Sequence, residues 1–365
     1  MPKSSSVVSR YWLTKVFVMA AAALVLAGCS TSASPSPSVT STDSEESQAA
    51  TETPGASAEP EAVTLRLDFR TTGSHGGSFL ALERGYFADE GLDVEILDGE
   101  GSATTTQVVG SGGDTFGWAD ASVVALNVSA GVPVVMVADV LQQTPALVLS
   151  RADDPIDEPS DLEGKTVGLT FGGSAEQLLA ALTTVNGLDP EGIATVNMEG
   201  SAQPVAFLSG SVDALVTSLG TALATTREAQ EQGFDTNILW FADHGVNVLA
   251  HGYIVRDETL ESRPELVEAF LRAAIRGWED AAADPQAAVD AIIVNRPDAD
   301  PELMRSQLDI FLTQFHTEAT EACPVGWQAE EDWQAMLDFL STYGGMEDPQ
   351  PPDTYFVNDF LPEGC

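Results

Sequence analysis

The pattern of hydrophobic and polar residues first becomes regular at residue 63. Hydrophobic residues alternate with polar ones over 63–69, which is the period of a half-buried β-strand. A glycine-rich loop at 71–77, a helical segment at 79–84 and a second strand at 92–97 follow. This order predicts a β-α-β unit.

The same alternation continues to residue 255 and predicts two successive α/β series. In the first we expect helices at 104–109 and 122–130 and strands at 115–118, 133–141 and 146–150. In the second we expect strands at 165–170, 194–198, 213–217 and 237–241 and helices at 174–185, 204–208 and 222–232. A return strand is expected at 248–255. Strand-end loops of two such series meet in a common cleft, so the pattern predicts a hinged two-lobe α/β fold.

The remaining chain is predicted to be helical. Hydrophobic residues recur at helical spacing over 262–280, where Ser262 and Glu265 have the spacing of a capping box. Further helices are expected at 285–294, 301–315 and 330–343. No repeat of 20 to 50 residues is evident, which argues against a solenoid.

The first 28 residues have the layout of an export signal. Three basic residues precede a hydrophobic run at 16–27, which is too short to span a bilayer comfortably. The run ends in Leu26-Ala27-Gly28-Cys29, which resembles the bacterial lipobox, whose cysteine carries the lipid. An ordinary signal peptide with an incidental cysteine is the alternative.

A tether is expected after the signal. Residues 30–60 contain nine Ser, five Thr, four Pro and a single large aliphatic residue, so they cannot bury a core. We expect a signal peptide at 1–28 and a lipidated Cys29 with a disordered tether at 29–61. The folded domain would then be held at the extracytoplasmic face of the cell membrane.

Charge excludes one class of partner. The chain has 15 Lys and Arg against 56 Asp and Glu, a net charge of -41, so nucleic-acid phosphate would be repelled. After residue 28, 12 basic residues stand against 56 acidic ones, a net charge of -44, and the only lysine is Lys165. Cys323 and Cys365 are a possible disulfide pair outside the cytoplasm, and two unpaired thiols are the alternative.

Several motifs resemble one family of binding proteins. The run Ala-Leu-Glu-Arg-Gly-Tyr-Phe-Ala-Asp-Glu-Gly-Leu-Asp-Val at 81–94 is similar to a signature of the SsuA/THI5-like family, which includes sulfonate, taurine, nitrate and thiamine-pyrimidine binders. Further matches lie at 110–117, 161–168 and 209–214. The resemblance runs from about Val63 to about Trp278.

The resemblance implies a type II periplasmic-binding-protein fold, with lobe 1 at 62–148 plus 249–365 and lobe 2 at 149–248. Such a protein captures a small molecule by lobe closure and delivers it to the permease and ATPase of an ABC importer. We expect a monomer that needs no cofactor and no metal.

Candidate ligand contacts in lobe 1 follow the expected strand ends. Ser74, His75 and Gly76 lie in the loop after the first strand, and a thiamine-pyrimidine branch of the family has a similar Asn-His-Thr-Gly run. A plain glycine turn is the alternative. Asp120 and Ser122 match the family's second binding loop, and either can also cap the next helix.

Candidate contacts in lobe 2 lie at three places. Phe171, Gly172, Gly173 and Ser174 connect a strand to a helix, where free amides could meet the ligand or be capped internally. Ser218 follows another strand. Asn247 lies at the crossover, where a hinge role is the alternative to ligand contact.

One or two aromatic residues are expected to stack on a ring-shaped ligand. The candidates are Phe69, Trp118, Phe171, Trp240, Phe241 and Tyr253, whereas Phe270, Trp278 and Phe311 look structural. The named cleft segments hold no Arg or Lys, which favours a thiamine-type pyrimidine or another heteroaromatic over sulfonate, taurine or nitrate. For Arg70 we expect a surface ion pair, with an anion contact as the alternative.

A THI5-like pyrimidine synthase is the enzymatic alternative. Such relatives carry a pyridoxal-phosphate lysine in the first lobe and a cysteine-rich iron motif, and this chain departs on both counts. Lys165 starts a strand of the second series, the cysteines are not clustered, and the four histidines lack metal-ligand spacing. We therefore expect a binding protein and not an enzyme.

Overall fold

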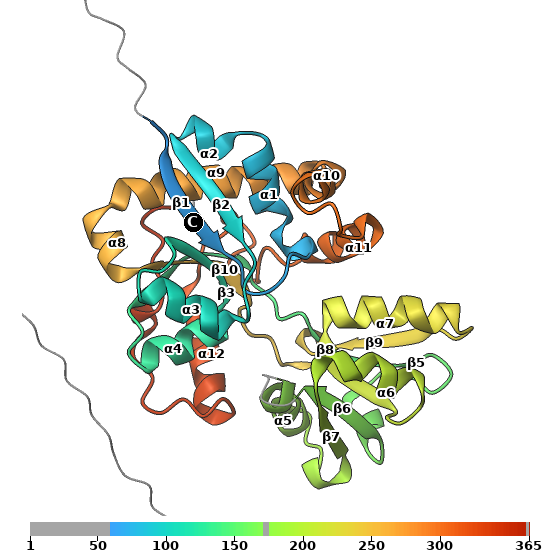
Figure 1. The fold of residues 1–365 in the computed structure, drawn as a ribbon. Coiled ribbons are helices and arrows are strands. Elements are labelled where there is room, and N and C mark those ends of the chain that lie inside the picture. The colour runs from blue at the N-terminus through green and yellow to red at the C-terminus, as the bar shows by residue number, and fades with distance from the viewer. Residues whose placement is uncertain (1–58, 171–174, 363–364) are drawn as a thin grey trace, which may run out of the picture. The chain divides into compact units, whose positions relative to one another are not determined.

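Two five-stranded sheets with flanking helices make up the structure, a computed structural model (Figure 1). It describes residues 59–170, 175–362 and 365. The predicted signal peptide, the lipidated Cys29 and nearly all of the predicted tether lie outside the described residues. Within the described part of the chain, no helix is both long enough and apolar enough to cross a membrane.

The first sheet has four strands that run in one direction and one, β10, that runs in the opposite direction. Its order is β2-β1-β3-β10-β4, and β10 runs antiparallel to β3 and β4. Its strands are β1 (Glu61–Arg66), β2 (Leu92–Leu97), β3 (Phe116–Asp120), β4 (Val134–Leu141) and β10 (His251–Arg256). The predicted return strand is therefore β10, which enters the sheet between β3 and β4.

The second sheet repeats this plan. Its order is β7-β6-β8-β5-β9, with β5 antiparallel to β8 and β9. Its strands are β5 (Ala146–Arg151), β6 (Thr166–Thr170), β7 (Ala194–Met198), β8 (Ala214–Ser218) and β9 (Thr236–Trp240). The chain crosses between the sheets at 142–145 and 241–250. The predicted lobe boundaries, near 148 and 249, stay predictions.

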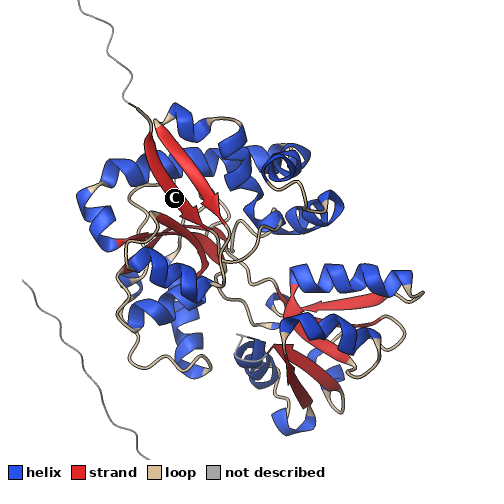
Figure 2. Cartoon of the chain, viewed as in Figure 1, coloured by secondary structure: helices blue, strands red, loops and turns tan. Residues whose placement is uncertain are grey.

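Helices flank both sheets (Figure 2). Those of the first series are α1 (Gly76–Glu83), α2 (Tyr86–Asp89), α3 (Ser102–Gly110) and α4 (Ala121–Ser129). Those of the second are α5 (Ala175–Val185), α6 (Gln203–Leu208) and α7 (Leu219–Glu231). The C-terminal part adds α8 (Asp257–Ser262), α9 (Pro264–Ala283), α10 (Pro285–Asn295), α11 (Pro301–Phe311) and α12 (Glu330–Thr342).

The helix predicted at 262–280 is two helices, and the predicted capping box is wrong. Ser262 ends α8, where its hydroxyl donates to the carbonyl oxygen of Glu258 at 2.6 Å. Pro264 begins α9, whose N-terminal cap is Arg263 without a side-chain cap bond. Proline lacks an amide hydrogen and forces the preceding residue out of the helical region, so the break falls at this position.

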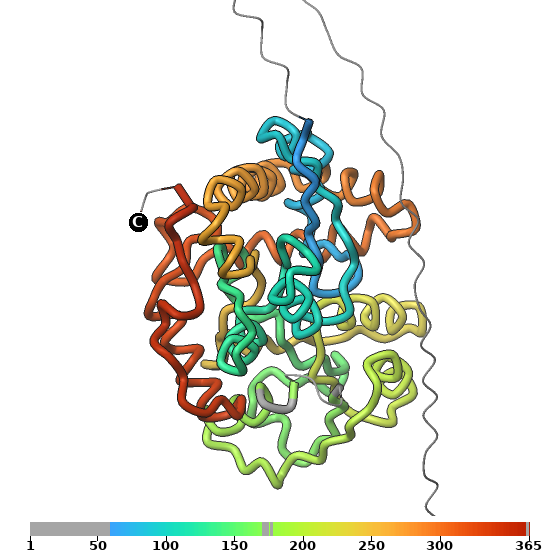
Figure 3. The backbone as a smooth tube through the Cα atoms, turned by 60° about the vertical axis from the view of Figure 1, so that its left-hand side comes forward, coloured from blue at the N-terminus to red at the C-terminus, as the bar shows by residue number. Residues whose placement is uncertain are grey.

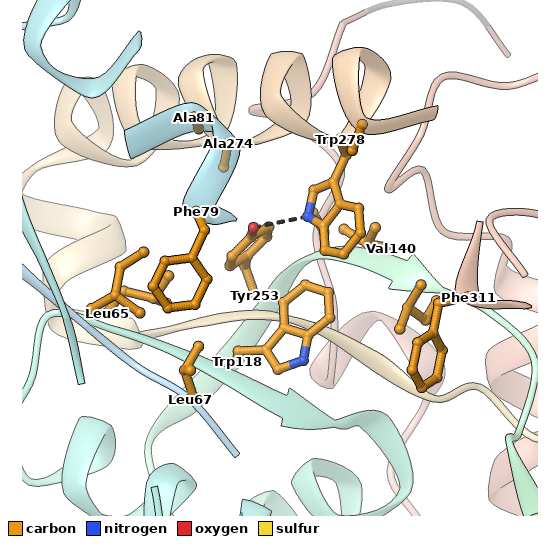
Figure 4. Packing of buried hydrophobic residues seen from close by; sticks show 14 of the residues in the cluster. Leu65, Leu67, Phe79, Ala81, Trp118, Val140, Tyr253, Ala274, Trp278 and Phe311 are labelled. Carbon is orange, nitrogen blue, oxygen red and sulfur yellow. Dashed lines mark hydrogen bonds between the residues drawn. The ribbon is translucent and has the colours of Figure 1, made fainter. Parts of the chain in front are cut away.

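Aromatic residues fill the core between the first sheet and α9. Trp118 of β3 and Trp278 of α9 stack with ring centroids 5.5 Å apart. The Trp278 indole donates to the Tyr253 hydroxyl at 3.0 Å (Figure 4). All three rings are fully buried, so they hold α9 on the sheet and are not free to stack on a ligand.

The C-terminal segment lies along α9. Residues 359–362 lie beside the Glu268–Glu279 face of this helix, red against orange in Figure 3. A disulfide joins Cys323 to Cys365, whose Cα atoms are 5.0 Å apart. This bond fixes the end of the chain to the segment between α11 and α12.

Candidate functional site

A carboxylate flanked by two imidazoles lies just past the end of β1. Asp68 Oδ1 is 2.8 Å from His75 Nε2, and Asp68 Oδ2 is 3.3 Å from His251 Nε2. His75 ends the short helix η1 (Gly73–His75), and His251 begins β10. The carboxyl end of β1 and the start of the antiparallel β10 lie at the same edge of the sheet, which explains why the three side chains meet there.

A hydrogen bond to the other ring nitrogen of His75 fixes the orientation of its imidazole. The backbone N–H of Thr72 donates to His75 Nδ1 at 2.9 Å. Since Nδ1 accepts this bond, the ring proton is on Nε2, which donates to Asp68. The side chain of His75 is only 1% exposed. The imidazole therefore positions the carboxylate, and its own donor is already used.

The charges of this cluster follow from its surroundings. Burial alone would raise the pKa of Asp68, but hydrogen bonds and charge from His251 and His75 lower it well below its ordinary value. Burial likewise opposes protonation of His251, yet Asp68, with the more distant carboxylate of Asp120, raises the pKa of His251 to about 9. At neutral pH the cluster contains an ionised carboxylate paired with a protonated imidazole.

A cavity of about 280 Å³ opens onto this cluster. Phe69, which is 54% exposed, and Arg70 line it beside Asp68. The first sheet and its loops also supply Thr72, Ser74, His75 and His251, the second series supplies Pro145, Ser218, Leu219 and Gly220, and α11 supplies Gln307 and Phe311. The cavity therefore combines one ionised carboxylate, one protonated imidazole, one guanidinium, hydroxyl groups and two phenyl rings.

Gln307 of α11 connects the two walls. Its side-chain oxygen accepts the backbone N–H of Gly73 at 2.9 Å, and its Nε2 lies 3.1 Å from where a Cβ on Gly220 would stand. A Cβ on Gly73 would lie 2.5 Å from the backbone of α11. Glycine at position 73 therefore permits the close approach of η1 to α11, and this approach places Gln307 in the cavity.

A family model described as NMT1/THI5 like matches residues 72–288. The chain belongs to the NMT1/THI5-like family. Two curated relatives cover most of it. The riboflavin-binding protein RibY of Chloroflexus aurantiacus is 29% identical over 86% of this chain and 90% of the relative. The formylaminopyrimidine-binding protein of Halalkalibacterium halodurans is 28% identical over 82% of this chain and 90% of the relative.

Solved structures give the same fold for this NMT1/THI5-like chain. The periplasmic aliphatic sulphonate binding protein SsuA from Escherichia coli superposes with a TM-score of 0.65 at 15% sequence identity. The match covers 82% of this chain and 92% of that protein. The predicted two-lobe periplasmic-binding-protein fold is confirmed.

The structure brings together only some of the predicted contacts of this family member. Ser74, His75 and Ser218 line the cavity. Gly76 packs against α11, and a Cβ at this position would stand 3.1 Å from the Leu308 side chain. Phe171, Gly172, Gly173 and Ser174 lie outside the described residues.

The other predicted contacts have structural partners. Asp120 caps α4 by accepting the Val123 N–H at 3.1 Å, and the Ser122 hydroxyl donates to the same carboxylate. Asn247 accepts the Thr144 N–H at 3.3 Å and so joins the two crossover segments. None of the three lines the cavity. The capping and hinge alternatives describe what these side chains do in this structure.

The aromatic residues predicted as candidates for stacking lie in different environments. Phe69 lines the cavity, Trp240 lines a neighbouring one, and Trp118, Phe241 and Tyr253 are fully buried in the core. Phe311, expected to be structural, lies at the cavity wall and is 7% exposed. Phe171 lies outside the described residues.

Two expectations about charged groups need correction. The surface ion pair expected for Arg70 is not among the ion pairs of the described residues. Arg70 lines the cavity instead, so the expectation of a ligand site without Arg or Lys is wrong. Asp68 was not predicted as a site residue because it falls within the strand predicted at 63–69, whereas β1 ends at Arg66 and leaves Asp68 in the loop that leads to His75. Phe69 and Arg70 directly follow Asp68 in the chain. A carboxylate, an aromatic ring and a guanidinium therefore lie next to one another at this edge of the first sheet.

His251 and Gln307 were also missed. His251 pairs with Asp120 across β3 and β10, so only the antiparallel register reveals that it lies near Asp68. Gln307 is more than 230 residues from Gly73 in the chain, and nothing in its local sequence distinguishes it. No cluster of three or more His, Cys, Asp or Glu that could hold a metal ion occurs within the described residues.

Proposed function

We propose that this protein is an extracytoplasmic solute-binding protein that captures a heteroaromatic molecule, with a thiamine-type pyrimidine as the first candidate, and delivers it to an ABC importer. Membership of the NMT1/THI5-like family, the fold and the two relatives named for riboflavin and formylaminopyrimidine support it. The ligand would lie in the Asp68 cavity, and closure of the lobes would enclose it.

The observation that carries this proposal is the ionised Asp68 beside the exposed ring of Phe69. A carboxylate held by two imidazoles accepts hydrogen bonds from ring or amino N–H groups, which a sulfonate group or nitrate cannot donate. The Phe69 ring offers a stacking surface. Arg70 supplies donors for a ring carbonyl or ring nitrogen.

The position of Lys165 does not support a synthase activity. Lys165, the only lysine of the described residues, pairs with Asp154 at 2.6 Å, at the amino end of β6. The lobe-2 residues of the cavity, Ser218, Leu219 and Gly220, instead lie at the carboxyl end of β8. No lysine therefore lines the cavity to form a Schiff base with a carbonyl cofactor.

The remaining parts of the proposal concern placement of the protein. Lipid on Cys29 would hold it beside the permease, and a tether at 30–60 would let it search at high effective concentration. We propose that it acts as a monomer, with lobes at 62–148 plus 249–365 and at 149–248. Deleting the gene should then abolish uptake of the ligand, and intact uptake would refute a transport role.

Ligand binding can be tested with the full chain carrying Cys29→Ser. Thermal shift and calorimetry with formylaminopyrimidine, hydroxymethylpyrimidine, riboflavin, taurine, an alkanesulfonate and nitrate should show binding of a heteroaromatic and none of the anions. Asp68→Asn should weaken that binding about 10- to 100-fold, because it removes a charged hydrogen-bond acceptor.

A matched variant separates the loss of a ligand contact from the general effect of removing a surface charge. Asp153→Asn removes an exposed carboxylate that is paired with Arg151, and it should leave the affinity within about twofold. Tight binding of taurine, an alkanesulfonate or nitrate with no response to any heteroaromatic would overturn the ligand class.

A further inference from the structure

Asp139 of β4 is a buried carboxylic acid whose side chain has no partner. It is fully buried, and neither of its carboxyl oxygens has a hydrogen-bond partner within the described part of the chain. Its backbone is fixed on both sides, because its N–H donates to the Gly326 carbonyl oxygen at 3.0 Å and its carbonyl oxygen accepts from Gln142 Nε2 at 2.9 Å. The function proposed so far does not use this residue.

His251 has a ring nitrogen that is also without a partner. Its Nε2 lies 3.3 Å from Asp68, and its Nδ1 is buried with no hydrogen-bond partner among the residues that the structure describes. A protonated imidazole carries a hydrogen on both ring nitrogens, so Nδ1 is a buried donor that lacks an acceptor. Most buried polar groups of folded proteins are hydrogen-bonded, so a buried donor and a buried acceptor that both lack partners call for an explanation.

Strand pairing places Asp139 next to His251. On β4, Leu141 is opposite His251 and Asp139 is opposite Gly252, so one extra residue, Val140, falls between the two pairs. Asp139 is therefore the diagonal neighbour of His251, at a separation that side chains can bridge. A Cβ on Gly252 would stand 2.7 Å from the Asp139 Cα, so glycine at this position allows β10 to approach β4 closely.

The charged groups around the two residues come from several elements. The charges that act on Asp139 are those of His251, of Asp120 at the end of β3 and of Asp332 in α12. Those that act on His251 are Asp68, Asp120 and Asp139. Asp120 and Asp332 already accept hydrogen bonds from other groups. Of these five side chains only His251 can carry a positive charge, so it is the favourable partner for the Asp139 carboxyl group.

Proton binding by the two groups is coupled. Burial raises the pKa of Asp139 well above its ordinary value, and the charge of His251 opposes this rise. Burial opposes protonation of His251, whereas Asp68, Asp120 and Asp139 raise its pKa. The charge on either group therefore depends on the protonation of the other.

We propose that Asp139 is a positioning residue of the ligand site, which stabilises the proton on His251 Nδ1 and so keeps the Nε2–H of the same imidazole donating to Asp68. One bridging water is enough to connect a donor and an acceptor on diagonal positions of a sheet. Loss of the proton leaves a single hydrogen on the ring, and in the Nδ1–H tautomer the Nε2 lone pair faces the Asp68 carboxylate. The inference rests on the proposed function, because Asp68 is the group that the ligand would contact.

Titration of His251 measures this role without any ligand. In the full chain carrying Cys29→Ser, the NMR midpoint of His251 should lie at about pH 9 and should fall by about one to two pH units in Asp139→Leu, because burial then opposes the charge with one acceptor fewer. Asp139→Asn should give an intermediate midpoint, because its amide oxygen still accepts from Nδ1–H but carries no charge. Midpoints within about 0.3 pH units of the parent in both variants would overturn the inference.

The pH dependence of ligand affinity distinguishes positioning from a merely structural role. Calorimetry with formylaminopyrimidine and with riboflavin compares each variant with the Cys29→Ser parent at the same pH, which cancels titration of the ligand itself. At pH 6, where His251 is charged in every variant, Asp139→Leu should bind within about twofold of the parent, and at pH 8 it should bind about 3- to 10-fold more weakly. Asp139→Asn should recover part of the loss at pH 8. It has the shape of the native side chain, so it also keeps the test decisive if Asp139→Leu fails to fold.

Asp114→Asn is the matched control. Asp114 is another nearly buried carboxylate beside the first sheet, but it lies at the opposite end of β3 from Asp120 and pairs with Arg66 at 2.8 Å. This variant should leave the His251 midpoint where it is in the parent. It should also lose no more affinity at pH 8 than at pH 6.

The possible failures are distinguishable. Equal losses of affinity at pH 6 and pH 8 in Asp139→Leu, or a His251 shift in Asp114→Asn as large as in Asp139→Asn, would overturn the role of Asp139 and leave the proposed function standing. Absence of any heteroaromatic binding by the parent would overturn the proposed function, and the His251 midpoints would still support or overturn the coupling of Asp139 to His251.

Discussion

Asp68 and His251 form a charged pair whose protonation can be followed directly. Folding raises the pKa of His251 from its ordinary value of 6.5 to about 9, so the folded state holds this proton more tightly than the unfolded chain. The resulting stability is complete below about pH 6.5 and is lost as the pH rises through about 9. We expect the free energy of unfolding to fall across this range.

Urea denaturation at several pH values and NMR titration of the imidazole measure this effect. His251→Gln should remove the part of the pH dependence between pH 6.5 and 9, and Asp68→Asn should bring the His251 titration back toward neutral pH because the main counter-charge is gone. A His251 midpoint below pH 7 in the unmodified protein would contradict the prediction.

Residues of the site differed in how far their sequence revealed them. His75 and Ser218 were predictable because each follows a strand recognisable by its periodicity, and strand ends form clefts. Asp68 obeys the same rule but was read as part of the strand pattern. His251 and Gln307 depend on pairing register and on helix packing between distant segments, which no local pattern contains.

Secondary-structure elements were mostly predictable, and the exceptions have local causes. The strands predicted at 92–97 and 194–198 have the same bounds in the structure, because alternating or continuous hydrophobic residues define them. The break at Pro264 was missed because hydrophobic periodicity continues across it. The predicted helix at 301–315 ends at Phe311, and beyond it Thr313 and Gln314 line the same cavity as Trp240.

Contact between α1 and α9 depends on two glycines facing each other. A Cβ on Gly277 of α9 would lie 2.3 Å from the carbonyl oxygen of Gly77 and 2.7 Å from the Ala81 Cβ. Alanine in a helix interior normally stabilises by about 1 kcal/mol relative to glycine. Gly277→Ala should instead lower the free energy of unfolding by about 1–3 kcal/mol, because the helices must move apart.

Chemical denaturation of Gly277→Ala checks this prediction against a glycine with room around it. At Gly192 the only atom within reach of a new Cβ is the Glu163 Cγ at 4.0 Å, so Gly192→Ala should stay within about 0.5 kcal/mol of the unmodified protein. A stabilising effect of Gly277→Ala would show that the two helices are not held at this distance.

At the scale of the whole molecule, the exchange of strands between the series was only partly predictable. The return of β10 followed from its position after the second series, but its insertion between β3 and β4 did not. The matching role of β5 in the second sheet was not predicted either, because β5 reads as one more strand of the first series. Pairing order is decided by packing between segments far apart in the chain, and sequence periodicity carries no information about it.

The Cys323–Cys365 disulfide closes a 42-residue separation at the end of the chain, and its contribution can be measured. A cross-link that closes a loop of this length restricts the unfolded chain and so raises the free energy of unfolding by about 4 kcal/mol. In the Cys29→Ser background, Cys323→Ser with Cys365→Ser should lower the free energy of unfolding by about this amount, because the segment beside α9 is no longer tied. Ligand affinity should stay within about twofold, since neither cysteine lines the Asp68 cavity. A reductant should destabilise the parent protein to a similar degree and have no further effect on the double variant. If the double variant lost less than about 1 kcal/mol of its free energy of unfolding, α9 would hold the C-terminal segment in place without the disulfide.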